Sequence, residues 1–294
     1  MDQFFDARRA ADLGIRGLAG VSPPLPALPN VTTFKGKLLI FSNAYESRTQ
    51  LPYTQSMVAT AMVLERMGIH WDYWPCLGDF HVNRAVNEAL TRAMRDDEVT
   101  DVLMIDTDER WDPMGVLRLL SHPDEIVGGA YRMKNAWDRY TCVLKWRRNE
   151  ATGKDEPVGR LLGDGTALLE ATRIPGGFMR IKTSALRKFE KAYPDRWYHH
   201  GEGRDVQFFG GNEVVDHVFQ SMDHAFCLAC TEIGIPLWID PNISIAHYGL
   251  TGYEGNLDQY LRNAAAQSEM DQKDQEALAA IQSMAADIAA RAAA

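Results

Sequence analysis

A continuous apolar run that ends in two aspartates constrains the fold of this chain more than any other feature. In "DVLMIDTDERWDP", residues 101–113, the run Val102–Ile105 has no polar position, which is typical of a strand buried on both faces of a parallel sheet. Asp106 and Asp108 follow where the strand leaves the core. Two carboxylates this close repel each other, and a divalent cation with oxygen ligands offsets such repulsion. The segment predicts a buried strand with a cation-binding end.

The segments before this strand alternate between strand and helix patterns. Strands are predicted at 37–43 and 69–76, and helices at 53–68 and 81–97. A β-α-β-α-β order predicts right-handed crossovers and a parallel sheet, whose ligands bind at the carboxyl ends of the strands. Asp106 and Asp108 are expected at one of those ends.

After the aspartates the pattern loosens. A short strand is predicted within 125–133, strands within 140–148 and 165–186, and a late strand over 235–249 with His247 near its end. A helix is expected from Thr183, with Thr183 and Ser184 as its N-caps. Another helix covers 223–234, where Cys227 and Cys230 occupy one face and indicate core packing rather than a zinc site.

The ends of the chain differ from its centre. Residues 1–35 are rich in proline and predict an extended arm, and 36–255 make one α/β domain. Residues 256–294 are alanine-rich and predict a helix whose apolar stripe suits docking or self-association into an oligomer. The stripe consists of Leu278, Ile281, Met284 and Ile288.

The sequence also bears on location. Neither a membrane span nor a secretory signal is evident, and the four cysteines are sparse and irregularly spaced. We therefore expect a reducing, cytoplasmic setting.

The net charge of −9 is unevenly distributed. Residues 132–204 contain 16 Lys and Arg against 9 Asp and Glu, a surplus of 7 positive charges. Cations and planar rings are what a nucleic-acid surface needs, although an ordinary solvated surface explains the charges as well. The interleaved residues are Trp137, Arg139, Tyr140, Lys145, Trp146, Arg147, Arg148, Arg196, Trp197, Tyr198, His199 and His200.

Several motifs follow one another in a definite order around the aspartates. They are "NRAVN", "VGGAYRMK", "PGGFMRIKTSAL", "SMDHAFC" and "GIPLWIDPNISIAHYG". Over residues 37–250 this set resembles glycosyltransferases of the GT-A fold, most of all the small ones that bacteriophages encode. The resemblance implies a Rossmann-like α/β fold with a mostly parallel sheet flanked by helices. It also implies a nucleotide-sugar donor such as a UDP-sugar, and Mn²⁺ or Mg²⁺ as cofactor.

The resemblance also implies roles for individual residues. Asp108 matches the metal-binding aspartate, His247 the late histidine that completes the metal ligands, and Asp106 the residue beside the donor sugar. Arg84 and Asn87 match positions that face the nucleotide, and Gly176, Gly177 and Phe178 match the floor under the acceptor. Asp223 matches the acidic residue that faces the acceptor hydroxyl, although the family's usual Glu-Asp pair is Met222-Asp223 here.

The chemistry of the residue types supports these roles. Arg84 or Lys134 would bind phosphate through charge-assisted hydrogen bonds, and Asp223 would take the acceptor proton if the anomeric configuration inverts. Because some phage enzymes of this kind add sugars to hydroxymethylated pyrimidines in DNA, such bases are the expected acceptor.

Other interpretations stay open. Asp106 and Asp108 would also suit a helix-capping turn, and His247 would also suit a backbone-bonded position at a strand end. The acceptor could instead be a polysaccharide or a lipid-linked glycan. A metal-dependent phosphohydrolase or nucleotidyltransferase would use the same aspartates, and a non-catalytic carbohydrate-binding protein could retain the fold. No G-x-G-x-x-G or Walker pattern is present, which argues against a dinucleotide oxidoreductase or a P-loop enzyme.

Overall fold

The structure is a computed structural model that describes residues 34–135, 139–215, 217–267 and residue 276. The chain divides into two compact units, Met1–Asn256 and Leu257–Ala294. Nearly all of the predicted arm, and the predicted stripe from Leu278 to Ile288, lie outside the described residues. In the second unit, residues 257–267 are helical.

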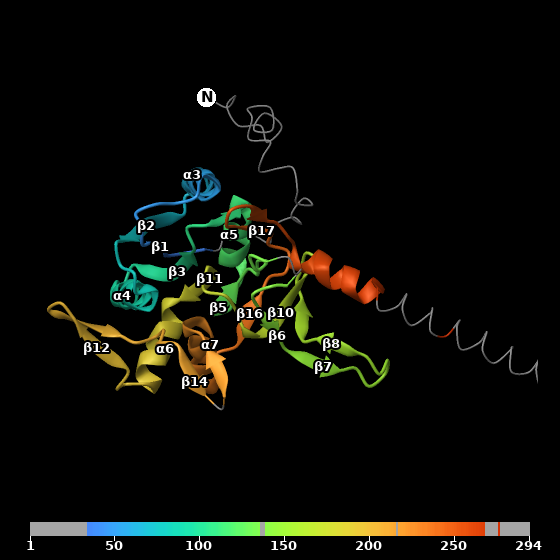
Figure 1. Cartoon of the computed structure of the whole chain (residues 1–294). Helices are drawn as coiled ribbons and strands as arrows, with labels where there is room; N and C mark the ends of the chain where they lie inside the picture. Colours follow the sequence, from blue (N-terminus) through green and yellow to red (C-terminus); the bar gives the residue numbers. More distant parts are fainter. Residues whose placement is uncertain (1–33, 136–138, 216, 268–275, 277–294) are drawn as a thin grey trace, which may run out of the picture. The chain divides into compact units, whose positions relative to one another are not determined.

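The first unit is built on a nine-stranded sheet in the order β2-β1-β3-β11-β5-β16-β10-β6, with β9 also paired to β10 (Figure 1). The strands are β1 (Lys37–Ala44), β2 (His70–Leu77), β3 (Val99–Ile105), β5 (Ile126–Gly128), β6 (Val143–Leu144), β9 (Gly159–Leu161), β10 (Ala167–Arg173), β11 (Phe178–Lys182) and β16 (Leu237–Ile239). Only β10 and β11 run against the other strands of this sheet. The predicted Rossmann-like α/β class with a mostly parallel sheet is therefore confirmed.

Helices cover both faces of the sheet. They are α3 (Leu51–Arg66), α4 (Val82–Arg95), α5 (Pro113–Ser121), α6 (Thr183–Ala192) and α7 (Met222–Glu232). Leu38 and Ile40 of β1 are fully buried in a core cluster with Tyr53 of α3 and Leu117 of α5. Leu39 and Phe41 alternate with them and face the opposite side of the sheet, where α4 contacts β1, β3 and α6. A strand buried on both faces explains why β1 and β3 are apolar throughout their centres.

Short strands form smaller sheets beside the main one. They are β4 (Glu109–Trp111) with β17 (Ile245–Tyr248) and β18 (Gly252–Tyr253), β7 (Trp146–Arg148) with β8 (Asp155–Pro157), β12 (Trp197–His200) with β13 (Gly203–Val206), and β14 (Glu213–Val215) with β15 (Val218–Gln220). The predicted late strand is thus two strands, β16 and β17, which belong to different sheets. The loop after β16 leads from the central sheet to β17, which pairs with β4 in a smaller sheet.

The predicted caps of α6 are wrong. The N-cap residue is Lys182, whose side chain makes no capping bond. Thr183 is buried, and its hydroxyl donates to the carbonyls of Val99 and Thr100 at 3.1 and 3.3 Å. Ser184 bonds Glu125 instead. Both hydroxyls therefore bond groups outside α6 and do not cap the helix.

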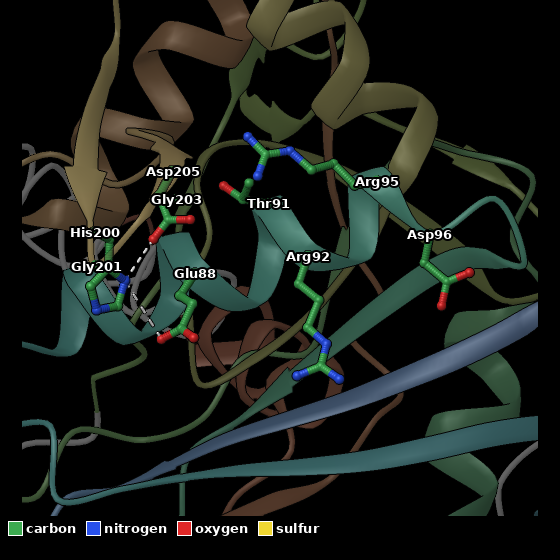
Figure 2. Close-up of a pocket in the computed structure, with 9 residues that line it drawn as sticks. All are labelled: Glu88, Thr91, Arg92, Arg95, Asp96, His200, Gly201, Gly203 and Asp205. Atoms are coloured by element: carbon green, nitrogen blue, oxygen red, sulfur yellow. Dashed lines mark hydrogen bonds and ion pairs between the residues drawn. The ribbon is translucent and has the colours of Figure 1, made fainter.

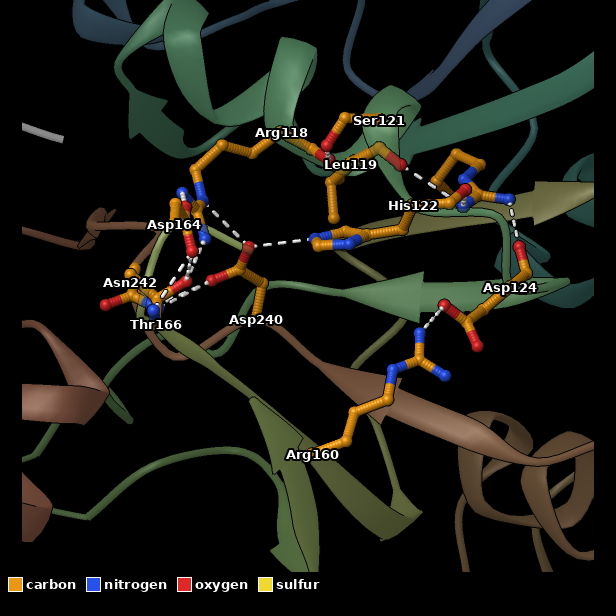
Figure 3. A network of polar contacts seen from close by, with 11 residues as sticks. Arg118, Leu119, Ser121, His122, Asp124, Arg160, Asp164, Thr166, Asp240 and Asn242 are labelled. Carbon is orange, nitrogen blue, oxygen red and sulfur yellow. Dashed lines mark hydrogen bonds and ion pairs between the residues drawn. The ribbon is translucent and has the colours of Figure 1, made fainter. Parts of the chain in front are cut away.

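A buried ionic network joins α5 and the residue after it to the end of β16 (Figure 3). The Asp240 carboxylate, at the end of β16, accepts from Arg118 Nε at 2.8 Å and bonds His122 Nε2 at 2.9 Å. Arg118 also reaches Asp164 and Thr166, both at 3.1 Å. Arg118 and Asp240 are fully buried, so each charge depends on the other for compensation.

The same Asp240 shapes the loop that leads to β17. Its other oxygen accepts from the backbone and side-chain nitrogens of Asn242 at 3.0 and 3.1 Å. Burial raises the pKa of Asp240, but His122 and Arg118 outweigh it and hold the pKa below its usual range. The network therefore anchors the segment that carries His247.

Two further expectations can be compared with the fold. All four cysteines are free, and Cys227 and Cys230 are buried on α7, as predicted. None of the helices in the described part of the chain combines the length and the apolar character needed to cross a membrane.

Candidate functional site

The two aspartates lie in a tight turn at the carboxyl end of β3. The Asp106 amide donates to Gly177 O at 2.9 Å, and the Glu109 amide donates to Asp106 O at 3.2 Å. The chain then enters β4, and the nearest helix cap is Asp112, which accepts from the Met114 amide at the start of α5. The capping interpretation of Asp106 and Asp108 therefore fails, because α5 has its own cap four residues later.

Strand β17 brings His247 to this turn. His247 pairs with Glu109 across the β4–β17 ladder, and the Tyr248 amide donates to Asp108 O at 2.7 Å. His247 Nε2 lies 3.7 Å from Asp108 Oδ1. His247 Nδ1 lies 3.0 Å from the carbonyl of Arg132, and such a bond requires the proton on Nδ1. Nε2 is then left with a lone pair facing Asp108, which is the state of a metal-binding imidazole.

A cation already contacts Asp108. The Lys134 ammonium bonds Asp108 Oδ2, and both side chains are about one-third exposed. Lys134 was expected to bind a donor phosphate, and that role stays a prediction. The neighbouring His247 has its pKa lowered, first by burial and then by the charge of Lys134.

Glu109 is a buried carboxylate that the sequence did not single out. Its side chain is fully buried, with the Tyr131 hydroxyl beside its carboxylate. Burial first, and then the charges of Asp106 and Asp108, raise its pKa well above the usual value, while the Tyr131 hydroxyl works in the other direction. Side chains alternate between the two faces of β4, so Glu109 lies on the same inward face as the buried Trp111. That alternation is the sequence signal that would have indicated a buried Glu109.

Gly177 is where these groups converge. A Cβ added to Gly177 would lie 2.5 Å from each of three oxygens, Asp106 Oδ2, Glu109 Oε1 and the Tyr131 hydroxyl. Any side chain at this position would overlap all three. The need for glycine here is therefore steric, and it comes from the acidic residues.

We predict a large loss of function for Gly177→Ala. Its methyl group must push Asp106 and Glu109 aside, at a cost of about 1–3 kcal/mol in stability. We expect Mn²⁺ affinity and turnover to fall together, measured by metal titration and by product formation. Gly163→Ala is the matched control, because a Cβ there meets nothing within 4 Å. Normal turnover by Gly177→Ala would show that the three oxygens do not need their present spacing.

A fourth carboxylate, Asp223, faces the same region from α7. Ser221 caps this helix, and Asp223 Oδ2 accepts from the Gly176 amide at 3.1 Å. Burial raises the pKa of Asp223. Burial, followed by the charges of Asp108 and Asp223, raises the pKa of Asp106 to about 7. The acidic residues thus act on one another electrostatically across the site.

A cavity of about 170 Å³ opens beside these carboxylates. Its lining combines apolar and polar groups from β1, β3, α4, α7 and the start of β11. The lining residues are Phe41, Asn43, Val82, Val86, Met104, Ile105, Asp106, Gly176, Gly177, Met222 and Asp223. Asn43 Oδ1 is buried and has no hydrogen-bond partner among the described residues, so the cavity contains one unused acceptor. Its place at the carboxyl ends of β1 and β3 is where ligands of such sheets bind.

Two residues expected near the nucleotide have other partners in the structure. Arg84 donates to both carboxylate oxygens of Asp79 at 2.8 Å. Asn87 is buried, and its amide bonds the backbone nitrogen and carbonyl of Phe209 at 2.8 and 2.9 Å. Both residues lie on α4, whose start lines the cavity. Their nucleotide contacts stay predictions.

Most of the interleaved aromatic and basic residues lie on or beside two separate hairpins, β7–β8 and β12–β13. Lys145, Arg147 and Arg148, on or beside β7, pair with Glu170, Glu156 and Asp155 at 2.7, 2.8 and 3.5 Å. On β12–β13, Arg204 stacks 4.2 Å above the ring of Trp197, which meets His199 edge-on at 5.1 Å. Trp137 falls outside the described residues. Figure 1 shows the hairpins at different ends of the sheet, so they do not form one continuous surface.

Helix α4 and the β12–β13 hairpin border a second hollow, of about 560 Å³ (Figure 2). His200 bonds Asp205 at 2.8 Å and lies 3.8 Å from Glu88. Arg92 lies over the ring of Trp74, and Arg95 donates to the carbonyl of Arg204. Neither arginine has a carboxylate partner among the described residues. Figure 2 shows them extending from α4 in different directions, so the hollow offers two separate cationic groups.

The donor set suits a divalent cation, although a formed cluster is not present in the described part of the chain. No three His, Cys, Asp or Glu side chains there already surround a common point. Asp108 and His247 nevertheless offer an oxygen and a nitrogen 3.7 Å apart. Two ligands bound to one cation at about 2.2 Å lie roughly 3–4 Å from each other. The Lys134 ammonium at Asp108 also fits a place that needs positive charge.

No protein-family model matches the sequence, and no curated protein does so significantly. Among solved structures, A197 from STIV is 14% identical, with a TM-score of 0.42 over 72% of this chain and 86% of that one. A 4-diphosphocytidyl-2C-methyl-D-erythritol synthase from Anaerococcus prevotii is 11% identical, with a TM-score of 0.30 over 57% of this chain and 80% of that one. Because both TM-scores are below 0.5, neither likeness indicates a shared activity.

Proposed function

We propose that this protein is a metal-dependent glycosyltransferase that moves a sugar from a nucleotide-sugar donor to an acceptor hydroxyl. The observation that carries the proposal is the convergence of Asp106, Asp108, Glu109 and His247 around the turn at the carboxyl end of β3. Asp223 faces the adjoining cavity. This arrangement provides an oxygen- and nitrogen-rich cation site next to a pocket for an organic ligand.

Each side chain has a distinct task in this proposal. Asp108 and His247 would hold Mn²⁺ or Mg²⁺, which stabilises the negative charge that develops on a departing diphosphate. Lys134 would exchange its bond to Asp108 for a bond to a phosphate oxygen, since both side chains are partly exposed. Asp223 would accept the proton of the acceptor hydroxyl, and its raised pKa brings it closer to that role.

A donor screen tests this function. Nucleotide sugars, UDP-sugars among them, are added with and without Mn²⁺, and the melting temperature is recorded. A ligand that binds the native state alone must raise that temperature. We expect at least one donor to do so only with the cation. A rise with free nucleotides alone, followed by phosphate release, would favour a phosphohydrolase or nucleotidyltransferase instead.

We propose hydroxymethylated pyrimidines in DNA as the acceptor. The supporting observation is that α4 lines both the cavity and the hollow of Figure 2. Val86 and Arg92 are six residues apart, which is about 9 Å along a helix. A nucleic-acid strand that contacts Arg92 and Arg95 would therefore pass close to the cavity. Such an enzyme would have to open the duplex or flip the base out of it.

The acceptor proposal predicts a specific salt dependence. Arg92→Ala/Arg95→Ala should weaken binding of single-stranded DNA and reduce the slope of log K against log salt by about 1.4, since each phosphate contact contributes about 0.7. Fluorescence anisotropy across a salt series measures both. Lys145→Ala/Arg147→Ala/Arg148→Ala is the control, because those side chains are already paired with carboxylates.

The competing acceptor is a glycan. Transfer of labelled sugar is compared on DNA that contains 5-hydroxymethylcytosine or 5-hydroxymethyluracil, on unmodified DNA, and on polysaccharide or lipid-linked glycans. If label enters a glycan and never the modified DNA, the nucleic-acid proposal is wrong and the glycosyltransferase proposal stands.

A further inference from the structure

We propose that the cavity beside the turn is the pocket for the acceptor base, and that Asn43 recognises the polar edge of that base. This inference rests on the proposed function, because it concerns the acceptor of the same transfer. Asn43 lies near the end of β1 and belongs to none of the motifs around the aspartates.

The size of the cavity suits a single ring. An apolar cavity of about 150 Å³ can hold one benzene molecule, and this cavity has a volume of about 170 Å³. It is too small for a whole nucleotide sugar, which combines a base, sugars and phosphates. Its occupant is therefore one ring, either the acceptor base or the sugar of the donor.

The lining favours a planar base over a sugar. A pyranose ring has hydroxyl groups around its whole circumference, and apolar side chains would leave many of them without a hydrogen-bond partner. A pyrimidine has two apolar faces and a polar edge, so its faces can pack against apolar side chains. The apolar residues of the lining are Phe41, Val82, Val86, Met104, Ile105 and Met222.

Asn43 provides a partner for the polar edge. Its Oδ1 is buried and bonds no donor among the described residues, which is unfavourable until a ligand supplies one. A side-chain amide has one acceptor oxygen and two donor hydrogens, and a half-turn about χ2 exchanges them. The Watson–Crick edge of a pyrimidine also presents a donor beside an acceptor, and enzymes that flip bases read that edge through hydrogen bonds.

The carboxylates of the cavity fit the rest of the same ligand. Asp106 and Asp223 line it together with Asn43, and the Gly176 amide holds Asp223 at 3.1 Å. The hydroxymethyl group of the base is on C5, next to the Watson–Crick edge. A base whose edge bonds Asn43 can therefore present its hydroxyl to Asp223, the proton acceptor of the proposed function.

An exposed aromatic pair lies close to the same lining. Tyr45 follows Asn43 by two residues, and Phe80 precedes Val82 by two. Their rings meet edge-on with centroids 6.3 Å apart, and both side chains are more than half exposed. Exposed aromatic rings are stacking surfaces for unpaired bases, so the neighbours of a flipped base would find a platform here.

The test is binding of single-stranded oligonucleotides by the full chain, measured by fluorescence anisotropy without donor or cation. One position of the oligonucleotide carries 5-hydroxymethylcytosine, 5-hydroxymethyluracil or an abasic site. We expect the wild type to bind at least one modified base more tightly than the abasic site. Asn43→Leu keeps the approximate size of the side chain and removes its hydrogen bonds. It should reduce this preference by about 5- to 150-fold, the usual effect of one bidentate contact between a side chain and a base.

A change in the ligand tests the same contact without a variant. Methylation at N3 blocks the Watson–Crick edge of the modified base. The wild type should then bind that oligonucleotide no better than the abasic one. This arm decides the inference even if Asn43→Leu does not fold. Asn263→Leu is the control variant, because it makes the same change at an exposed position and should bind like the wild type.

The contrary outcomes distinguish the inference from the proposed function. If folded Asn43→Leu keeps the full preference, or the wild type has none, the inference is wrong. Donor binding, followed by the Mn²⁺-dependent rise in melting temperature, tests the proposed function separately. If Asn43→Leu abolishes that rise and leaves oligonucleotide binding unchanged, the cavity holds the donor sugar, so the inference fails and the function stands. If no nucleotide sugar binds the wild type, the function fails, and the oligonucleotides still decide whether the cavity binds a base.

Discussion

Asp108→Asn is expected to lower sugar transfer by roughly 10³-fold while the protein stays folded. The substitution keeps the shape of the side chain and removes the charge that Lys134 and a cation would share. The Tyr248 amide bonds the backbone carbonyl of Asp108, so the β4–β17 connection survives. Because the Asp108 side chain is 31% exposed, no buried group loses its only partner. The effect is therefore expected in binding and chemistry and not in folding.

Two measurements separate these effects. The Mn²⁺-dependent rise in melting temperature caused by a nucleotide sugar should disappear in Asp108→Asn, while the melting temperature without ligands should change little. Asp155→Asn is the control, because it removes the same charge from the exposed β7–β8 hairpin. Chelation of the metal from the wild type should reproduce the loss of turnover. Full turnover by Asp108→Asn in metal-free buffer would contradict the assignment of Asp108.

The early part of the fold could be predicted because its signals are local. The apolar runs of β1 and β3 and the helices α3 and α4 between them follow from strand and helix periods alone. The predicted strand over 37–43 is observed as Lys37–Ala44, and the helix over 81–97 as Val82–Arg95. A strand buried on both faces has no polar position, and that pattern needs no knowledge of the partners.

The later part could not be predicted as well, because its elements depend on distant partners. The segment 235–249 reads as one strand, yet Asp240 divides it by binding Arg118 and His122, more than a hundred residues away. Thr183 is a residue type that often caps helices, and it instead bonds the first residue of β3. Such contacts between distant residues have no counterpart in local periodicity.

The candidate site also contains residues that the sequence predicted and residues that it missed. Asp106 and Asp108 were expected at a strand end, His247 was expected beside them from the resemblance to GT-A glycosyltransferases, and the structure brings the three together. Glu109 was missed because a glutamate beside an Asp-x-Asp motif looks like a solvated residue. Only the β4–β17 pairing, formed across 138 residues of sequence, turns it inward opposite His247. Asn43 was missed for the related reason that its lack of a partner is visible only in the folded chain.

Arg118→Met should cause the largest loss of stability of any substitution considered, about 3–5 kcal/mol. Methionine fills much of the same volume, but Asp240 then remains buried with only His122 and Asn242 as partners, and Asp164 loses a bond as well. Domains of ordinary stability have about 5–15 kcal/mol in total, so the variant should unfold at clearly lower urea concentration. The predicted loss of stability comes from leaving the Asp240 carboxylate buried without its guanidinium partner, and not from the missing packing of the arginine.

A second variant and a pH series separate those two sources. Arg118→Met/Asp240→Asn removes both charges and should be more stable than the sum of the single losses predicts. In the wild type the pKa of Asp240 is below its unfolded value, so its contribution is complete above that value and is lost as pH falls through the folded pKa. In Arg118→Met the guanidinium no longer opposes burial, although His122 still does, so the pKa of Asp240 should rise above its wild-type value. The stability difference between wild type and Arg118→Met should then be large at pH 7 and should shrink as the solution is acidified. A difference that stays constant down to pH 4 would mean that lost packing, and not the uncompensated charge of Asp240, is what destabilises the variant.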